Sequence, residues 1–182
     1  RLEQFYFEDA PTIVKRRYVD ADLLKLFEVY FYNDHPSPVG IEPRICSWLE
    51  KNTAEFDVVI VPDFGNGFIS ANMIQKICDH ARFLAVNTQV NSGNRGYHSI
   101  NRYPRADFIS LNGPELRIAT HNRHDSYEEL AKELANNIGV DQFAVTLGSD
   151  GALLFDRNQS IVHNTPVLST KVLDRIGAGD TF

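Results

Sequence analysis

The residues best suited to chemistry stand at the end of the sequence, where small residues precede an acidic one. Gly177, Ala178 and Gly179 let the backbone approach a ligand closely, and their N–H groups can converge on one anion. Asp180 follows where we expect a helix to begin, and helix N-termini attract phosphate. A carboxylate placed there could accept the proton of a hydroxyl that attacks phosphorus. The pattern indicates phosphoryl transfer, although a glycine-rich loop with an N-cap aspartate has the same sequence.

Four other polar residues each follow a short hydrophobic segment that we expect to be a strand. They are Asp63, Asn87, Asn112 and Thr146. In open α/β sheets, ligands bind beyond the carboxyl ends of the strands. We therefore expect these side chains to share one edge of a sheet and to face the turn at 177–180.

The elements that position these residues alternate along the chain. Hydrophobic, often β-branched runs predict strands at 56–61, 83–86, 108–111 and 143–146, and residues 152–155 with 160–163 predict a hairpin. Helices are expected from about residue 41, after Ser70, and after the capping box formed by Ser126 and Glu129. This order predicts an α/β fold with a mostly parallel sheet flanked by helices.

A separate pair of strands is expected before this part, at 11–19 and 24–32, with a turn at 20–22 between them. We assign residues 11–33 to this hairpin and residues 39–182 to the α/β domain. An isolated hairpin is only marginally stable in water, so this one needs a partner surface.

Composition narrows the class of protein. The 182 residues are 43% hydrophobic and 23% charged, with a net charge of −6, which suits a globular domain and argues against nucleic-acid binding. No apolar run is long enough to span a membrane. Cys46 and Cys78 are expected to be free thiols in a reducing compartment, the cytoplasm. The chain starts with Arg and has Met73 as its single methionine, so we expect a fragment that lacks both ends of its fold.

The terminal pattern, Asp174-x-x-Gly177-Ala178-Gly179-Asp180, resembles the second signature of the PfkB (ribokinase-like) carbohydrate kinases. This sequence has Arg175 where that signature usually has Thr. The resemblance implies a ribokinase-like fold, an anion hole at the Gly-Ala-Gly turn, and Asp180 as the catalytic base.

Two internal motifs resemble the same family. Asn112 and Glu115 match an Asn-x-x-Glu motif, which implies a role in organising Mg²⁺ and phosphate; a capping role in the first turn of a helix is the alternative. Thr146, Gly148 and Gly151 match a Thr-x-Gly-x-x-Gly element, which implies proximity to ATP. The same residues would also make a plain hairpin turn.

The N-terminal part of this chain resembles a subgroup of the same family, the heptose-phosphate kinases. There the segment corresponding to 11–28 belongs to a β-lid that covers the sugar and often forms a dimer contact. The resemblance also implies that the substrate edge includes Asp63, Asn66, Asn87 and Gln89.

This chain departs from the subgroup at the substrate edge. Asn66 replaces a usual lysine, and Asn87-Thr88-Gln89 stands where the subgroup has Asp-Pro-Lys. Arg95, His98 and Arg102 could supply replacement charge, but we interpret them as solvated loop residues.

Together these features predict an ATP- and Mg²⁺-dependent enzyme that transfers phosphate to a hydroxyl of a sugar or sugar phosphate. A non-catalytic sugar- or nucleotide-binding homologue, or a regulatory scaffold whose hairpin only dimerises, remains the alternative. The resemblance further implies a possible fused nucleotidyltransferase domain beyond residue 182.

Overall fold

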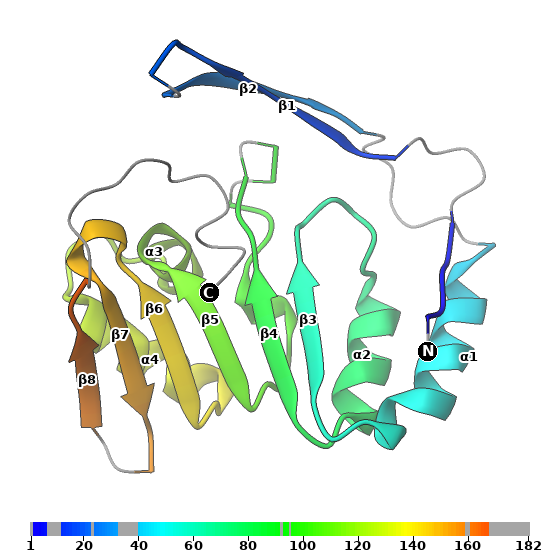
Figure 1. The fold of residues 1–182 in the computed structure, drawn as a ribbon. Coiled ribbons are helices and arrows are strands. Elements are labelled where there is room, and N and C mark those ends of the chain that lie inside the picture. The colour runs from blue at the N-terminus through cyan, green and yellow to red at the C-terminus, as the bar shows by residue number, and fades with distance from the viewer. Residues whose placement is uncertain are drawn as a thin grey trace.

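The computed structural model describes residues 2–6, 12–22, 24–32, 40–91, 93–94, 96–158 and 161–167. Its main sheet has six strands in the order β3-β4-β5-β6-β7-β8 (Figure 1). Strands β3 to β6 pair in parallel, whereas β7 and β8 are antiparallel to their neighbours. The strands are β3 (Val59–Asp63), β4 (Leu84–Thr88), β5 (Phe108–Asn112), β6 (Gln142–Thr146), β7 (Ala152–Asp156) and β8 (Ile161–Thr165).

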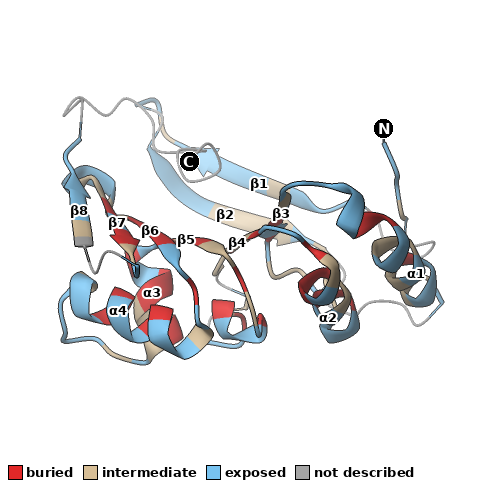
Figure 2. Ribbon diagram, turned by 90° about the horizontal axis from the view of Figure 1, so that it is seen from below, coloured by how far each residue is buried: buried red, intermediate tan, exposed pale blue. Residues whose placement is uncertain are grey.

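Helices cover one face of this sheet. Figure 2 shows α2, α3 and α4 on the same side of the strands, and α1 packs against α2. Strand residues that point toward the helices are buried, such as Val61, which is 5% exposed. Its neighbour Ile60 points to the other face and is 72% exposed. The helices are α1 (Glu42–Asn52), α2 (Ala71–His80), α3 (Gly113–Thr120) and α4 (Tyr127–Ile138).

Local signals fix the ends of these helices. The Ser70 hydroxyl accepts a hydrogen bond from the Met73 N–H and caps α2. Ser126 and Glu129 form the expected capping box at the start of α4, and Gly139 ends that helix with φ of 76°. The core then forms between helices and sheet, where Leu84, Ile109, Leu116, Leu130 and Phe143 are fully buried. The predicted α/β fold with its mostly parallel sheet is confirmed.

Within the described residues no helix is long and apolar enough to cross a membrane. Cys46 and Cys78 are both free thiols, and burial raises the pKa of each. Cys78 belongs to the hydrophobic core beneath the sheet, and Cys46 is half-buried on α1.

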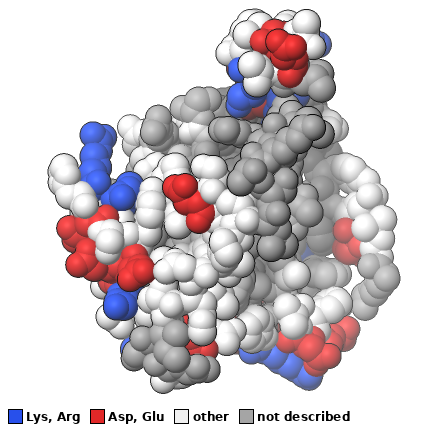
Figure 3. Space-filling view, turned by 60° about the vertical axis from the view of Figure 1, so that its left-hand side comes forward, with Lys and Arg blue, Asp and Glu red and all other residues white. Residues whose placement is uncertain are grey.

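The N-terminal hairpin is a separate antiparallel sheet of β1 (Val14–Val19) and β2 (Lys25–Phe31). The Asp20 carboxylate accepts hydrogen bonds from the N–H groups of Asp22 and Leu24 and so shapes the turn. The hairpin extends above the carboxyl ends of the main strands (Figure 1). Figure 3 shows it standing above the body, with Lys and Arg atoms at its underside. The hairpin therefore forms a roof over the carboxyl edge of the sheet, where the sequence predicts the site.

Candidate functional site

The carboxyl edge of the sheet brings the polar strand ends together. Asn112 is paired in register with Thr146, and Asn87 is paired with Ser110 and with Pro62 next to Asp63. These ends lie beneath the hairpin (Figure 1). The expected convergence of four strand ends on one edge is therefore present. Gly177, Ala178, Gly179 and Asp180 lie outside the described residues.

A capping box at the start of α3 fixes Asn112 and Glu115. The Asn112 Oδ1 accepts a hydrogen bond from the Glu115 N–H at 2.8 Å, and the Glu115 Oε2 accepts one from the Asn112 N–H at 2.9 Å. The other carboxylate oxygen of Glu115 accepts the N–H of Val90 at 3.1 Å, which ties the loop after β4 to the helix. Burial raises the pKa of Glu115, which is only 5% exposed. A carboxylate offers about four acceptor positions, so two remain for water or a cation.

Asn112 and Glu115 line a pocket of about 740 Å³ between the hairpin and the sheet edge. Its floor also includes Gln89, one of the residues expected at the substrate edge. Its roof comes from the hairpin and includes Phe27 together with the polar side chains of Lys15, Arg17, Lys25, Glu28 and Tyr30. The pocket therefore joins residues from two parts of the chain that the sequence linked only by resemblance.

The charged groups of the roof are ordered by contacts within the hairpin. Arg17 forms an ion pair with Glu28, and a hydrogen bond with Tyr30 lowers the pKa of Glu28. Burial, followed by Glu28, raises the pKa of Tyr30 to about 12. The ammonium group of Lys15 lies 5.2 Å from the centre of the Tyr30 ring and 5.1 Å from that of Phe64. Lys15 thus connects the hairpin to the loop after β3.

Asp63 has a different environment from the one expected of a substrate ligand. Its carboxylate is 3% exposed and accepts hydrogen bonds from the Tyr103 hydroxyl at 2.9 Å and the Arg102 guanidinium at 3.2 Å. The Gly65 N–H donates a third hydrogen bond to it, and His98 Nε2 lies 3.5 Å from Oδ1. Asp63 therefore ties residues 98–103 to the end of β3.

The interpretation of the loop residues as solvated is wrong for His98, which is 5% exposed. Burial lowers its pKa, with Arg102 acting in the same direction and Asp63 opposing them. The Arg102 side chain is 32% exposed, and it donates to Asp63 and to the Ile69 carbonyl. Both side chains contact the buried Asp63 carboxylate, and this contact explains why they do not extend into solvent. Arg95 lies outside the described residues.

The same loop positions the pocket floor. The Asn94 amide donates hydrogen bonds to the carbonyls of Gly65 and Gln89, at 3.3 and 3.2 Å. The Gln89 N–H donates to the Asp63 carbonyl at 2.8 Å. Asp63 and Asn94 therefore act on the site indirectly, because their hydrogen bonds hold the Gln89 backbone in position. Sequence reasoning missed Tyr103 and Asn94 because they lie in a stretch without periodicity.

The other two residues expected at the substrate edge are placed nearby. The Asn87 amide donates to the Ser110 carbonyl at 2.8 Å, so it bridges β4 and β5 on the open face of the sheet. Asn66 lies half-buried in the loop after β3, between Gly65 and Gly67, whose φ values are 67° and 78°. Neither side chain lines the pocket under the hairpin.

The 146–151 motif forms a tight turn between β6 and β7. A short 3₁₀ turn, Gly148–Asp150, is closed by the Leu147 N–H donating to the Gly151 carbonyl. Gly148 and Gly151 have φ of 62° and 90°. A Cβ on Gly151 would also stand 2.0 Å from the Thr165 carbonyl oxygen. The glycines of this motif are thus required by the turn itself, with Thr146 beside Asn112 at its start.

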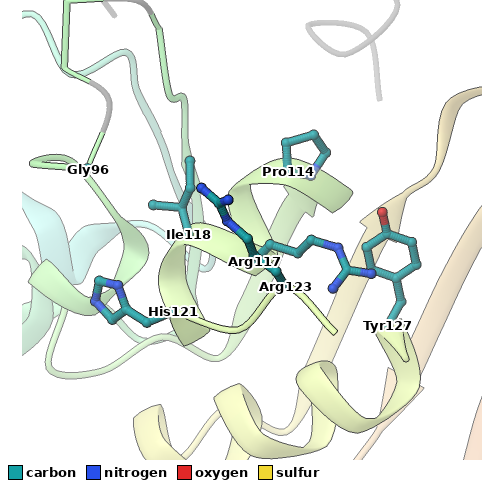
Figure 4. A pocket seen from close by; sticks show the side chains of 7 residues that line it. All are labelled: Gly96, Pro114, Arg117, Ile118, His121, Arg123 and Tyr127. Atoms are coloured by element: carbon teal, nitrogen blue, oxygen red, sulfur yellow. The ribbon is translucent and has the colours of Figure 1, made fainter. Parts of the chain in front are cut away.

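A second hollow of about 750 Å³ lies on the other side of α3 (Figure 4). Arg117, Pro114 and Tyr127 line it, and the Arg117 guanidinium stacks 4.5 Å from the Tyr127 ring centre. It contains none of the residues singled out by the motifs. We therefore take the pocket under the hairpin as the candidate site. In the described ranges no three acidic, His or Cys side chains gather as a ready metal site.

Curated proteins of known name match this chain over most of its length. The bifunctional protein HldE of Rhodopseudomonas palustris is 27% identical over 178 residues, which cover 96% of this chain and 36% of that protein. The bifunctional protein HldE of Helicobacter hepaticus is 26% identical over 174 residues, 94% of this chain and 35% of that protein. The chain thus spans about a third of the length of these curated relatives.

Solved structures match with the same arrangement of elements. Ribokinase from Thermotoga maritima gives a TM-score of 0.68 at 17% identity, covering 94% of this chain and 53% of that one. Arabidopsis thaliana ribokinase, complexed with ribose and ATP, gives 0.63 at 18% identity, covering 95% and 54%. The ribokinase-like fold is therefore confirmed. A model of the pfkB family of carbohydrate kinases matches residues 70–182, more than half of the sequence, and the chain belongs to that family.

Proposed function

We propose that the protein transfers a phosphoryl group from ATP to a hydroxyl of a sugar or sugar phosphate, with Mg²⁺. Family membership supports the reaction class. The observation that carries the proposal for these residues is the pocket that places Asn112 and Glu115 beneath a charged hairpin. A polar, partly covered pocket at the carboxyl ends of parallel strands suits a sugar and a nucleotide phosphate.

Each motif has one role in this proposal. Asp180 accepts the proton of the attacking hydroxyl, and the N–H groups of Gly177, Ala178 and Gly179 stabilise the transferred phosphoryl group. Thr146, Gly148 and Gly151 approach the nucleotide from the β6–β7 turn. The buried N-terminus of α3 adds its dipole near the phosphates.

Asn112 and Glu115 would hold Mg²⁺, which neutralises charge on the transferred phosphoryl group. The fit is supported by the Glu115 carboxylate, which lines the pocket and keeps two acceptor positions beyond its bonds to Asn112 and Val90. Mg²⁺ retains much of its water, so contact through water is consistent with the low exposure of Glu115.

The wider assembly belongs to the same proposal. The face of the hairpin opposite Lys15 and Tyr30 exposes Val14, Tyr18 and Phe31 at 46%, 40% and 49%, which suits a homodimer contact. The relatives are named bifunctional, and this chain spans about a third of their length, which favours a fused nucleotidyltransferase domain. The free thiols favour the cytoplasm.

A second candidate is a homologue that binds a sugar or nucleotide without transfer. It is favoured by Asn66 and Gln89, which remove positive charge from the substrate edge relative to the resembling kinases.

Steady-state kinetics on the full-length protein separate the two candidates. A panel of sugars and sugar phosphates is assayed for ADP release, together with Asp180→Asn. The variant should retain nucleotide affinity and lose roughly two to four orders of magnitude in rate, because Asn cannot accept the hydroxyl proton. Binding of panel compounds without ADP release would favour the non-catalytic homologue. A variant rate within about threefold of the wild type would remove Asp180 from the mechanism.

A further inference from the structure

We propose that Asn91 and Asn94 form a positioning unit, the asparagine clasp, which holds the loops after β3 and β4 in one arrangement and thereby sets how the acceptor is held. The inference rests on the proposed function and adds to it two residues that belong to none of the motifs. Asn91 lines the pocket under the hairpin, whereas Asn94 does not. A substitution of Asn94 therefore tests positioning without removing a contact with the ligand.

The Asn94 amide is engaged on both of its polar atoms. Its Nδ2 donates to the carbonyls of Gln89 at 3.2 Å and Gly65 at 3.3 Å. The Phe64 carbonyl lies 3.5 Å from the same nitrogen. The Oδ1 accepts the Asn91 N–H at 2.8 Å. An amide carries its donors on one atom and its acceptor on the other, so only this orientation satisfies the partners on both sides.

A reciprocal turn presents this amide to the two loops. The Asn91 Oδ1 accepts the Asn94 N–H at 3.0 Å, while the Asn94 Oδ1 accepts the Asn91 N–H. This is the hydrogen-bond pattern of a capping box, at the same three-residue spacing. The Asn91 Nδ2 adds a bond to the Phe64 carbonyl at 3.3 Å. The asparagine clasp therefore couples formation of a local turn to the contact between the loops.

The backbone at Gly65 makes room for the clasp. Gly65 has φ of 67°, and a Cβ at this position would stand 2.0 Å from the Asn94 Nδ2. The same Cβ would stand 2.8 Å from two carbons of the His98 ring. A side chain at position 65 would push the amide away from the loop after β3. The close approach therefore depends on both loops.

The groups that the clasp holds belong to the candidate site. Phe64 and Gln89 line the pocket, and the Phe64 ring contacts the Lys15 ammonium group of the hairpin. The Val90 N–H, next to Gln89, donates to the Glu115 carboxylate. The clasp therefore sets the spacing between the hairpin, the pocket floor and the start of α3. Misplacement of reacting groups by about 1 Å can cost about a hundredfold in rate, so a residue that sets this spacing affects turnover without touching a ligand.

A local role as a turn cap is the alternative, and one substitution separates it from positioning. Asn94→Asp retains the Oδ1, which can still accept the Asn91 N–H, and removes the Nδ2 donor. Because aspartate is a good capping residue, a purely local role would survive this change. Positioning would not survive it, since a carboxylate would face the carbonyl oxygens of Gly65 and Gln89 without a donor between them.

The test compares full-length Asn94→Asp and Asn94→Ala with Asn101→Asp as the matched control. The Asn101 Nδ2 donates to the Ala119 carbonyl at 2.8 Å, so the control removes the same kind of bond at the far end of α3. Far-UV circular dichroism first establishes that each variant is folded.

Hydrogen exchange, read by mass spectrometry on peptides that span 59–68 and 84–91, reports on the two loops. The Gly65 N–H donates to the Asp63 side chain and the Gln89 N–H donates to its carbonyl, so both amides are protected while the loops stay in place. Both Asn94 variants should exchange roughly fivefold faster in these peptides, the effect of one net hydrogen bond. Asn101→Asp should leave them unchanged.

Steady-state kinetics then separate positioning from a loss of folded protein. The substrates are ATP with Mg²⁺ and the sugar or sugar phosphate that gives the fastest ADP release in the panel. Both Asn94 variants should raise KM for this acceptor and lower its kcat/KM roughly tenfold to a hundredfold, with KM for ATP within about twofold. A smaller folded fraction would instead lower kcat and leave both KM values unchanged.

The remaining outcomes decide against the inference or against the kinase proposal. If Asn94→Asp has the exchange and kinetics of the wild type, Asn94 is a turn cap and the inference is overturned. Faster exchange with an unchanged KM for the acceptor, or equal effects in Asn101→Asp, would also overturn it. A wild type that releases no ADP with any panel compound would remove the kinase proposal. Faster exchange in the Asn94 variants would then still sustain the positioning of the two loops.

Discussion

Removing one hydroxyl tests whether the buried Asp63 carboxylate depends on the loop that follows β4. Tyr103 is 1% exposed, and its hydroxyl donates to Asp63 Oδ2 at 2.9 Å. Burial, with Asp63 adding to it, raises the pKa of Tyr103, so the hydroxyl remains a donor at any working pH. Tyr103→Phe keeps the ring and deletes only this donor. A hydrogen bond to a charged group contributes about 1.5–3 kcal/mol, so we expect the free energy of unfolding to fall by about 2 kcal/mol.

The loss should not be larger, because Arg102 and the Gly65 N–H still donate to the carboxylate. Urea unfolding of the full-length protein, followed by far-UV circular dichroism, gives the difference from the midpoints at a common slope. Tyr97→Phe is the matched control, since Tyr97 is 92% exposed and should change stability by less than about 0.5 kcal/mol. If Tyr103→Phe is as stable as Tyr97→Phe, Asp63 does not depend on this hydroxyl and the proposed link between loop and β3 is refuted.

Three further predictions concern single residues. Glu115→Gln should raise the Mg²⁺ concentration needed for half-maximal turnover; an unchanged requirement with up to ~1 kcal/mol lower stability would leave Glu115 as a helix cap. Because burial lowers the pKa of His98, its stabilising contribution is complete above about pH 6.5 and is lost as the pH falls. His98→Gln should therefore flatten the decline in melting temperature from neutral pH toward pH 5, and an equal decline in both proteins would contradict this. Gly151→Ala should destabilise more than Gly148→Ala, since both have positive φ but an added methyl at Gly148 meets no atom within 4 Å. Equal unfolding midpoints would argue against the clash with the β8 end.

The features that the sequence predicted well are those encoded within a few residues. Ser126 and Glu129 cap α4 because a three-residue spacing is sufficient for the reciprocal hydrogen bonds. The short hydrophobic runs at 56–61 and 83–86 overlap β3 and β4, although β3 begins three residues after the start of its run and Ile60 is 72% exposed on the face without helices. Strands β3 to β6 are parallel and run in the same direction, so their carboxyl ends lie at one edge of the sheet.

The features that escaped prediction depend on contacts between distant residues. Asp63 and Tyr103 are 40 positions apart, and nothing in either neighbourhood signals their hydrogen bond. The burial of His98 follows from that contact, so its interpretation as a solvated residue was wrong. The register of the hairpin shifts between Tyr18 and Val19, which pairs with Lys25, and this shift depends on both strands at once. Neither strand alone therefore predicts that Lys25 lines the pocket.

The charged side chains that the hairpin turns toward the pocket bear on how easily the site opens. In a lid that closes by burying apolar surface, the hydrophobic effect stabilises the closed state even without a ligand. Product release must then overcome that free energy. One contact between this hairpin and the sheet edge is that of the Lys15 ammonium group with the Phe64 ring, which is worth about 0.5–2 kcal/mol. A ligand that contacts both the hairpin and the sheet edge would favour the closed state, so ligand occupancy would shift the open and closed populations. Departure of the product would then itself shift the hairpin toward the open state.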